Sequence, residues 1–198
     1  MTSIPSSIPA APASTEQIQK DLADARLAAK KIRRAASYAT FDAWTVGIFG
    51  ALSFISGLFG GMSAVLLGAA MVIVAYVEFK GITRIRQVDP TAAKTLAYNQ
   101  LALSAVLIIY ALWSLHSIPT MASVSGQLGE NADLIDSGQV DSWLRMGWFL
   151  LYGTVIAVAV FGQGGTALYY LSREKHIRQY VQTTAPWVVE MQRSGGPL

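Results

Sequence analysis

The side chains most able to do chemistry in this sequence are six polar residues that lie in or beside long apolar stretches. They are Asp42, Glu78, Lys80, Asn99, Gln100 and Gln163. A charged group inside a membrane is costly and is rarely kept without a use. We expect Asp42 or Glu78 to pair with a nearby cation such as Lys80 at the level of the lipid headgroups, which would fix helix register. The alternative is that these groups line the inner vestibule of a pore between subunits.

Most other chemistry is excluded by the composition. The sequence contains no Cys, which excludes disulfides, zinc ribbons, iron–sulfur ligation and thiolate catalysis. Its two histidines, His116 and His176, fall on opposite sides of the membrane in the topology that the cations predict, so they cannot share a haem or a metal within one subunit. We therefore expect no cofactor and no metal site.

Sequence motifs for catalysis are missing as well. No Gly-x-Ser-x-Gly, His-Glu-x-x-His or phosphate-loop motif occurs, and the run Gly162-Gln163-Gly164-Gly165 lacks the Lys that should follow. The acids between residues 130 and 141 do not have the spacing of an EF-hand. We expect no catalytic residue. The remaining enzyme alternative is action on a lipid at the inner interface, with Asp42, Glu78 and Asn99 as its polar groups.

The element that must position these groups is a stretch of 35 residues, Ala43 to Val77, without Asp, Glu, Lys or Arg. One crossing of a bilayer needs about 20 apolar residues, so this stretch predicts two crossings joined by a turn. Gly57, Gly60 and Gly61 lie near its middle, where they would let the backbone reverse. The whole chain is 53% hydrophobic and only 14% charged, against about 25% charged residues in a typical soluble domain.

These patterns predict an all-α, polytopic membrane protein built as a bundle of four transmembrane helices. The predicted spans cover about 38–59, 62–82, 96–116 and 147–171, within a transmembrane domain at 38–171. Asp89 before Pro90 is typical of a helix start. We expect a disordered tail at 1–13 and a cytoplasmic tail at 172–198 that contains a last short helix after Pro186.

A basic amphipathic helix is predicted at 14–37, because Ser14 and Gln17 form a capping box and apolar residues recur every three or four positions. Its cations include Lys30, Lys31, Arg33 and Arg34. Two readings stay open: the helix lies on an anionic lipid surface, or it packs on its own protein. Nucleic acid is not an expected partner, since these cations immediately precede a span.

The distribution of cations predicts the orientation. Of the 15 Lys and Arg residues, 14 lie in the N-terminal segment, the loop between the second and third spans, and the C-terminal tail. By the positive-inside rule, both termini are cytoplasmic and the acidic loop at 117–144 lies outside. The expected location is the cell membrane.

Small residues at helical spacing predict close helix packing in lipid. They fall in two sets: Ser53, Gly57, Gly61, Ala64 and Gly68 in the first hairpin, and Gly153, Ala157 and Gly164 in the fourth span.

The function that we expect from these features is a non-catalytic one. The chain would act as a self-associating scaffold or an accessory subunit of a membrane complex, with the bilayer and other membrane subunits as its partners. Two alternatives remain. The first is an oligomeric ion or solute channel with a pore between subunits, and the second is a membrane-shaping protein that uses the basic helix and the short hairpin.

Overall fold

The computed structural model describes residues 14–117 and 137–196 of the chain. The predicted disordered tail at 1–13 and most of the acidic loop lie outside the described residues. The described part is helical throughout, without a strand. Its elements are α1 (Thr15–Ala28), α2 (Lys30–Gly60), α3 (Met62–Arg86), α4 (Pro90–His116), α6 (Ser137–Ala157), the π-helical segment η2 (Val158–Gln163), α7 (Gly164–Thr183) and α8 (Pro186–Arg193).

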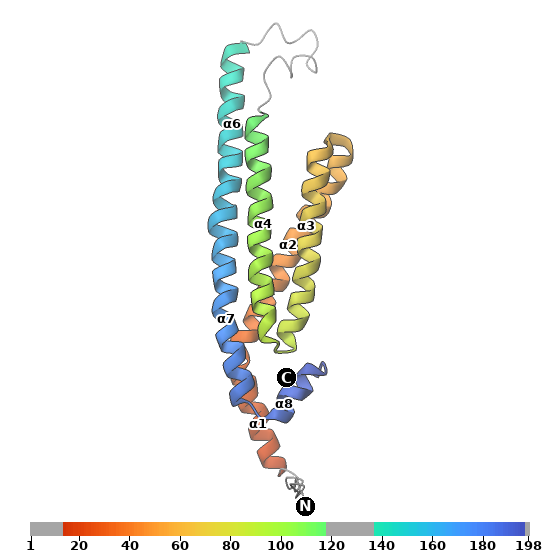
Figure 1. Cartoon of the computed structure of the whole chain (residues 1–198), viewed down its shortest axis with the longest axis vertical. Coiled ribbons are helices and arrows are strands. Elements are labelled where there is room, and N and C mark those ends of the chain that lie inside the picture. Colours follow the sequence, from red (N-terminus) through yellow and green to blue (C-terminus); the bar gives the residue numbers. More distant parts are fainter. Residues whose placement is uncertain (1–13, 118–136, 197–198) are drawn as a thin grey trace, which may run out of the picture.

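Four of the described helical stretches are long and apolar enough to cross a membrane: Lys30–Phe59, Met62–Arg86, Pro90–His116 and Gln139–Thr183. The prediction of an all-α chain with four such helices is therefore confirmed. The helices pack as two pairs (Figure 1): α2 and α3 form a hairpin, and α4 runs beside α6, η2 and α7. Helices α1 and α8, the first and the last of the described helices, lie at the same end of the bundle.

The first span is not separate from the basic segment that precedes it. We expected a boundary near residue 38, but α2 begins at Lys30 and continues to Gly60. The only interruption in this region is at Ala29, and even there Ala29 N donates to Ala25 O (2.8 Å) and Arg33 N to Ala29 O (2.9 Å). Residues 30–59 contain no proline, and the alanines near their start favour helix, so nothing ends the helix at 38.

Most of the apolar stripe of α1 and early α2 is buried against protein. Ala25, Ala29 and Ile32 belong to one core cluster with Ile177 of α7 and Val188 of α8. Trp187 Nε1 adds a hydrogen bond to Asp21 Oδ2 at 3.2 Å. The part of the stripe nearest α2 therefore packs on the protein itself, whereas Ile18 is exposed. Contact of this helix with an anionic lipid surface stays a prediction. The cations Lys30, Lys31, Arg33 and Arg34 stay exposed.

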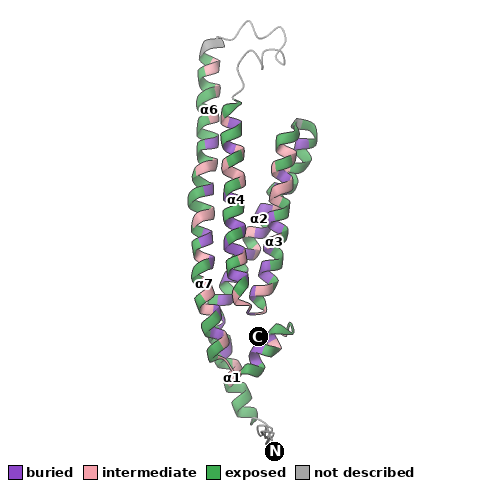
Figure 2. Cartoon of the chain, viewed as in Figure 1, coloured by how far each residue is buried: buried purple, intermediate pink, exposed green. Residues whose placement is uncertain are grey.

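Burial is uneven along the bundle (Figure 2). Buried residues gather in the lower half, where α2, α3, α4 and α7 meet, whereas α6 is mostly exposed. Toward the other end, a groove with a volume of about 450 Å³ opens between α3 and α4, lined by apolar residues such as Leu66 and Ile109. The lower half therefore holds the bundle together.

Glycines bring α2 and α3 into backbone contact. A Cβ added at Gly68 would collide with the backbone of Phe54, and one added at Gly57 would collide with the backbone of Val65. Gly61 has a different role, because its φ of 131° places it in the turn between the two helices. A Cβ there would meet nothing within 4 Å. Ser53 and Ala64 are half-buried near this contact.

The turn between α3 and α4 is a Schellman motif with an unusual residue. Val88 N donates to Ile85 O (2.9 Å) and Asp89 N to Arg84 O (3.0 Å), the two bonds that define the motif. Val88 has a φ of 52°, a left-handed conformation that strains a β-branched residue. Its side chain is only 1% exposed, so packing in the lower core offsets the strain.

Asp89 starts α4 as predicted. Its Oδ1 accepts from Thr91 N at 2.8 Å, and its Oδ2 lies 2.7 Å from Arg84 Nη2. Burial alone would raise the pKa of Asp89, but the hydrogen bonds from Thr91 and the Arg84 guanidinium outweigh it and hold that pKa below its usual value.

We predict that Gly68→Ala destabilises the protein by about 1–3 kcal/mol, because its Cβ forces α2 and α3 apart. The free energy of unfolding, measured by SDS titration of mixed micelles, checks this. Gly153→Ala is the matched control, since a Cβ at Gly153 would meet nothing within 4 Å. Equal stability of the two variants would show that the close α2–α3 contact is absent.

We also predict that the charge of Asp89 stabilises the fold above about pH 4 and that this contribution is lost as the pH falls, because its folded pKa is below its unfolded one. Asp89→Asn keeps the cap but removes the charge, at a cost below about 1 kcal/mol for a partly exposed ion pair. The melting temperatures of the two proteins should differ at pH 7 and converge at pH 3. A difference that does not change with pH would contradict the assignment.

Candidate functional site

Four helices each contribute one polar side chain to a single hydrogen-bonded group in the lower half of the bundle. Asp42 comes from α2, Glu78 from α3, Gln100 from α4 and Tyr170 from α7; we call these residues the acid–amide cluster. Gln100 Nε2 donates to Asp42 Oδ2 (2.6 Å) and to Glu78 Oε1 (2.8 Å). Tyr170 Oη donates to the same Glu78 oxygen at 3.3 Å. One amide nitrogen thus joins two acids.

The cluster is buried. Glu78, Gln100 and Tyr170 are 0% exposed, and Asp42 is half-buried. Two of its oxygens, Glu78 Oε2 and Gln100 Oε1, are buried without a hydrogen-bond partner. A buried acceptor left in this state costs about 1–3 kcal/mol. The acid–amide cluster therefore has fewer hydrogen-bond donors than its acceptor oxygens require.

No cation balances the two acids. The ion pairs among the described residues are Arg84–Asp89, Lys94–Glu174 and Arg178–Glu174, and none includes Asp42 or Glu78. The expected pairing with Lys80 is therefore wrong. Lys80 Nζ instead lies 4.8 Å from the ring centre of Tyr76. The physical reason is helix geometry, because residues 78 and 80 point about 200° apart around a helix with 3.6 residues per turn.

Two carboxylates joined by one amide can do limited chemistry. Two like charges that share one hydrogen-bond donor repel each other, and the repulsion is stronger inside a protein than in water. A proton or a small cation held on the free oxygens would relieve that repulsion and supply the missing partner. The arrangement can therefore hold a proton or cation. It contains no activated nucleophile, and among the described residues no three His, Cys, Asp or Glu side chains could together hold a metal ion.

Helix α4 forms other polar links beside the cluster. Asn99 Nδ2 donates to Val74 O of α3 at 3.0 Å, and Ser104 Oγ donates to Ala159 O of η2 at 2.8 Å. Nearer the C-terminus of α4, Ser114 O accepts a hydrogen bond from Trp148 Nε1 of α6 at 3.1 Å. Asn99 thus ties two helices together and is separate from the acids.

The π-helical segment was not predicted from the sequence. It spans Val158–Gln163, where the hydrogen-bonding pattern widens by one residue. Ser104 satisfies one of its carbonyls, and Thr166 Oγ1 donates to another, Gly162 O, at 2.9 Å. Gln163 lies at its end with a buried, unpartnered Oε1, apart from the acid–amide cluster. The glycines around Gln163 were the one local signal of an irregular helix.

The remaining predicted packing residues lie in poorly covered parts of the described chain. Gly153 and Ala157 are exposed on α6, and Gly164 is half-buried. A Cβ added at Gly153 or at Gly164 would meet nothing within 4 Å. Sequence reasoning also missed Tyr170 as a member of the acid–amide cluster. Its partner lies 92 positions away, so no local pattern could reveal it.

The chain matches no protein-family model, no curated protein and no solved structure. The interpretation of the site therefore depends on its geometry.

We predict that Gln100→Leu destabilises the protein by about 3 kcal/mol or more, because it leaves the fully buried Glu78 and the half-buried Asp42 without their shared donor. Asn99→Leu is a matched control on the neighbouring residue. It removes one hydrogen bond to a backbone carbonyl and should cost about 1 kcal/mol. The free energy of unfolding in mixed micelles measures both. Equal losses of unfolding free energy in the two variants would mean that the acid–amide cluster stabilises the fold no more than a single ordinary hydrogen bond does.

Proposed function

We propose that this protein is a non-catalytic subunit of a membrane assembly and that it associates laterally through the exposed face of α6. The observation that carries the proposal is the poor coverage of the fourth span. In the most apolar 18-residue part of this span, only 11% of the residues are buried, against 33% in the corresponding part of the third span. Gly153 and Ala157 lie four residues apart on this helix, so they share a face that no other part of the described chain covers.

Small residues on an open helix face suit a partner helix in lipid. Apolar surface alone does not drive helices together in a bilayer, because the lipid tails are equally apolar. Gly and Ala let two backbones approach closely, and this gain in packing favours association. The partner is another membrane helix, from a second copy of the chain or from a different subunit.

The same geometry weakens the other two candidates. A pore between subunits must be lined by side chains that are exposed in each subunit, and Glu78 is 0% exposed. A membrane-shaping helix must insert its apolar stripe into lipid. That stripe is instead packed against α7 and α8.

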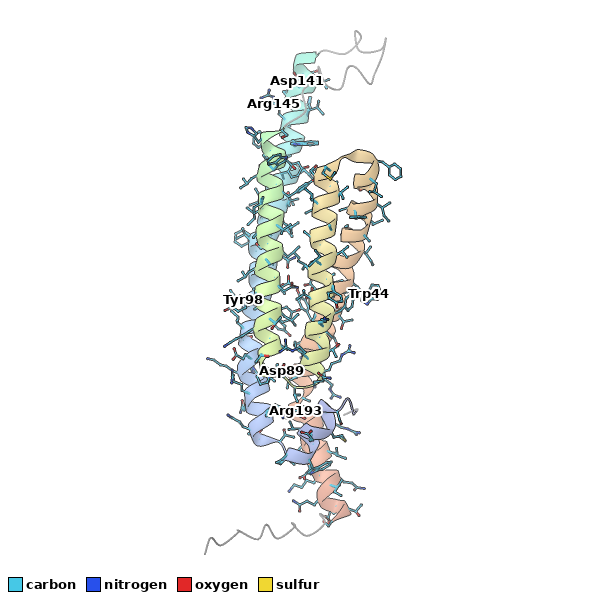
Figure 3. The ribbon with its side chains drawn as sticks, turned by 45° about the vertical axis from the view of Figure 1, so that its right-hand side comes forward. Trp44, Asp89, Tyr98, Asp141, Arg145 and Arg193 are labelled. Carbon is cyan, nitrogen blue, oxygen red and sulfur yellow. The ribbon has the colours of Figure 1, made fainter. Side chains whose placement is uncertain are left out.

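We further propose that the protein lies in the cell membrane with both termini in the cytoplasm. In support, Arg193 and Asp89 lie toward the lower end of the bundle and Arg145 toward the opposite end (Figure 3). Most of the cations are on the side of Arg193, as the positive-inside rule requires of the cytoplasmic side. Trp44 and Tyr98 point outward at similar heights, as expected for aromatic residues of an interfacial belt.

We predict that Gly153→Leu with Ala157→Leu shifts the detergent-solubilised particle to a smaller mass, because the bulky side chains hold the partner helix away. The mass is measured by light scattering, and the melting temperature shows whether each subunit stays folded. Gly147→Leu is the matched control, since Gly147 is also an exposed glycine of α6 without a neighbour but points about 120° away from Gly153. An unchanged mass in the double variant would contradict association through this face.

We also predict that a membrane-impermeant maleimide added to intact cells labels Ser142→Cys but not Ser194→Cys. Both positions are exposed, and the chain has no other Cys to react. Labelling of Ser194→Cys after the membrane is permeabilised is the positive control. The reverse pattern would overturn the orientation, and labelling of both variants in intact cells would overturn the four-span topology.

A further inference from the structure

The acid–amide cluster contains fewer donor hydrogens than acceptor oxygens. Gln100 brings two N–H hydrogens and Tyr170 brings one O–H. Both Gln100 hydrogens are used, one toward Asp42 and one toward Glu78. The Tyr170 hydrogen is directed at the same Glu78 oxygen. Glu78 Oε2 and Gln100 Oε1 are left buried without a hydrogen-bond partner. A proton added to Glu78 Oε2 turns one of these two acceptors into a donor.

The two carboxyl groups of the cluster also contact each other. Besides sharing Gln100 Nε2, the side chains of Asp42 and Glu78 lie within hydrogen-bonding reach of each other. Carboxylates only accept, so this contact is a hydrogen bond only when one of the two groups carries a proton. Carboxyl groups that interact this closely take up and release protons as a pair. The contact therefore favours one proton for the two acids.

The hydrogen-bond partners of Glu78 among the described residues bring no positive charge. They are Asp42 of α2, Gln100 of α4 and Tyr170 of α7, an acid and two neutral donors. None of the ion pairs in the described part of the chain includes either acid. Glu78 is 0% exposed, and a buried charge without a counter-charge is costly. A bound proton removes that charge.

A proton suits the free oxygens of the cluster better than a metal cation does. Hard cations such as Mg²⁺ and Ca²⁺ take about six or more oxygen ligands. The cluster offers two buried oxygens that lack a partner, one on Glu78 and one on Gln100. A proton needs only one oxygen that carries it and one that accepts from it. It also needs no space of its own between buried side chains.

Asp42 is the member of the cluster that reaches the surface. It is half-buried, whereas the other three members are 0% exposed. The cluster also lies near one end of the bundle, because Glu78 is much closer along α3 to Arg86, its last residue, than to Met62, its first. A proton that enters or leaves the cluster therefore passes by way of Asp42, at the end that carries most of the cations.

We propose that the acid–amide cluster is a binding site for one proton, which Asp42 and Glu78 share and which exchanges with water by way of Asp42. With the proton bound, the pair of acids carries one negative charge instead of two. Release of the proton to water restores the second charge and the repulsion between the acids. The proposal does not depend on lateral association through α6, because none of the four residues of the cluster lies on that helix.

Infrared spectroscopy of the full chain in neutral detergent micelles tests the site, because a protonated carboxyl group has a C=O stretching band that a carboxylate lacks. The wild-type protein should show this band at neutral pH, and Glu78→Gln should remove it. The band should shift when D₂O replaces H₂O, because the exchanging O–H becomes O–D. Absence of the band from the wild-type protein would overturn the proposal. A band that does not shift after long incubation in D₂O would overturn the exchange through Asp42.

The matched control is Glu174→Gln, the same substitution at an acid of α7. Glu174 lies 3.4 Å from Lys94 Nζ and 2.7 Å from Arg178 Nη2, so its charge is already balanced. This variant should leave the band unchanged, and loss of the band here instead of in Glu78→Gln would overturn the assignment. If Glu78→Gln fails to melt cooperatively, Asp42→Asn takes its place. It changes the partner of the proton and should shift or remove the band, whereas an unchanged band would contradict sharing.

The pH dependence of stability separates a proton from a metal cation. A proton that is bound in the folded protein and released on unfolding stabilises the fold at low pH, and this stabilisation is lost as the pH rises. The melting temperature of the wild-type protein should therefore fall relative to that of Glu78→Gln between about pH 5 and about pH 8, since an amide keeps its donor at every pH. A difference that stays constant over this range would contradict the proposal.

Replacement of choline by Na⁺ at constant ionic strength completes the test. The melting temperature of the wild-type protein should not change, because the free oxygens hold a proton. A melting temperature that rises with Na⁺ in the wild-type protein but not in Glu78→Gln would show that the cluster binds a metal cation instead and would overturn the proposal.

Discussion

The Gln100 side-chain amide is the one interaction on which the rest of the structure depends. Its nitrogen donates to acids from two other helices, and one of these acids also accepts from Tyr170. Polar groups inside the membrane-spanning part of the bundle have no water to form hydrogen bonds with, so each must find a hydrogen-bond partner inside the protein. The hydrogen bonds of the buried Glu78 and the half-buried Asp42 to one donor, together with that of Tyr170, bring α2, α3, α4 and α7 together at one level.

This constraint explains the shape of the molecule. Below the acid–amide cluster, a continuous core joins α1, α7 and α8, and small residues let the helices approach each other. Above it, α3 and α4 are separated by an apolar groove, and one face of α6 is not covered by any described part of the chain. Four helices are therefore packed together at the end that carries most of the cations, whereas at the other end the close α2–α3 pair is separated from α4 by the groove. The open surface is the part available to lipid or to another subunit.

The sequence predicted those features that depend on local patterns. Apolar length predicted four spans, and Asp89 with Pro90 predicted a helix start. The glycine spacing indicated the close α2–α3 approach, which the structure has at Gly57 and at Gly68. It also singled out Asp42, Glu78 and Gln100, because polar residues in apolar stretches are conspicuous. It could not predict that they meet. Their partners are 22 to 92 positions apart along the chain, and the choice between Lys80 and Gln100 depends on how the helices are rotated.

A double-mutant cycle between Gln100 and Glu78 tests the central claim most directly. Gln100→Leu, Glu78→Leu and the double variant are compared by their free energies of unfolding in the same micelles. If the amide exists to satisfy the acid, removing both should cost less than the sum of the single losses by at least about 1 kcal/mol. Losses that add to within about 0.5 kcal/mol would contradict the account, because independent sites behave in that way.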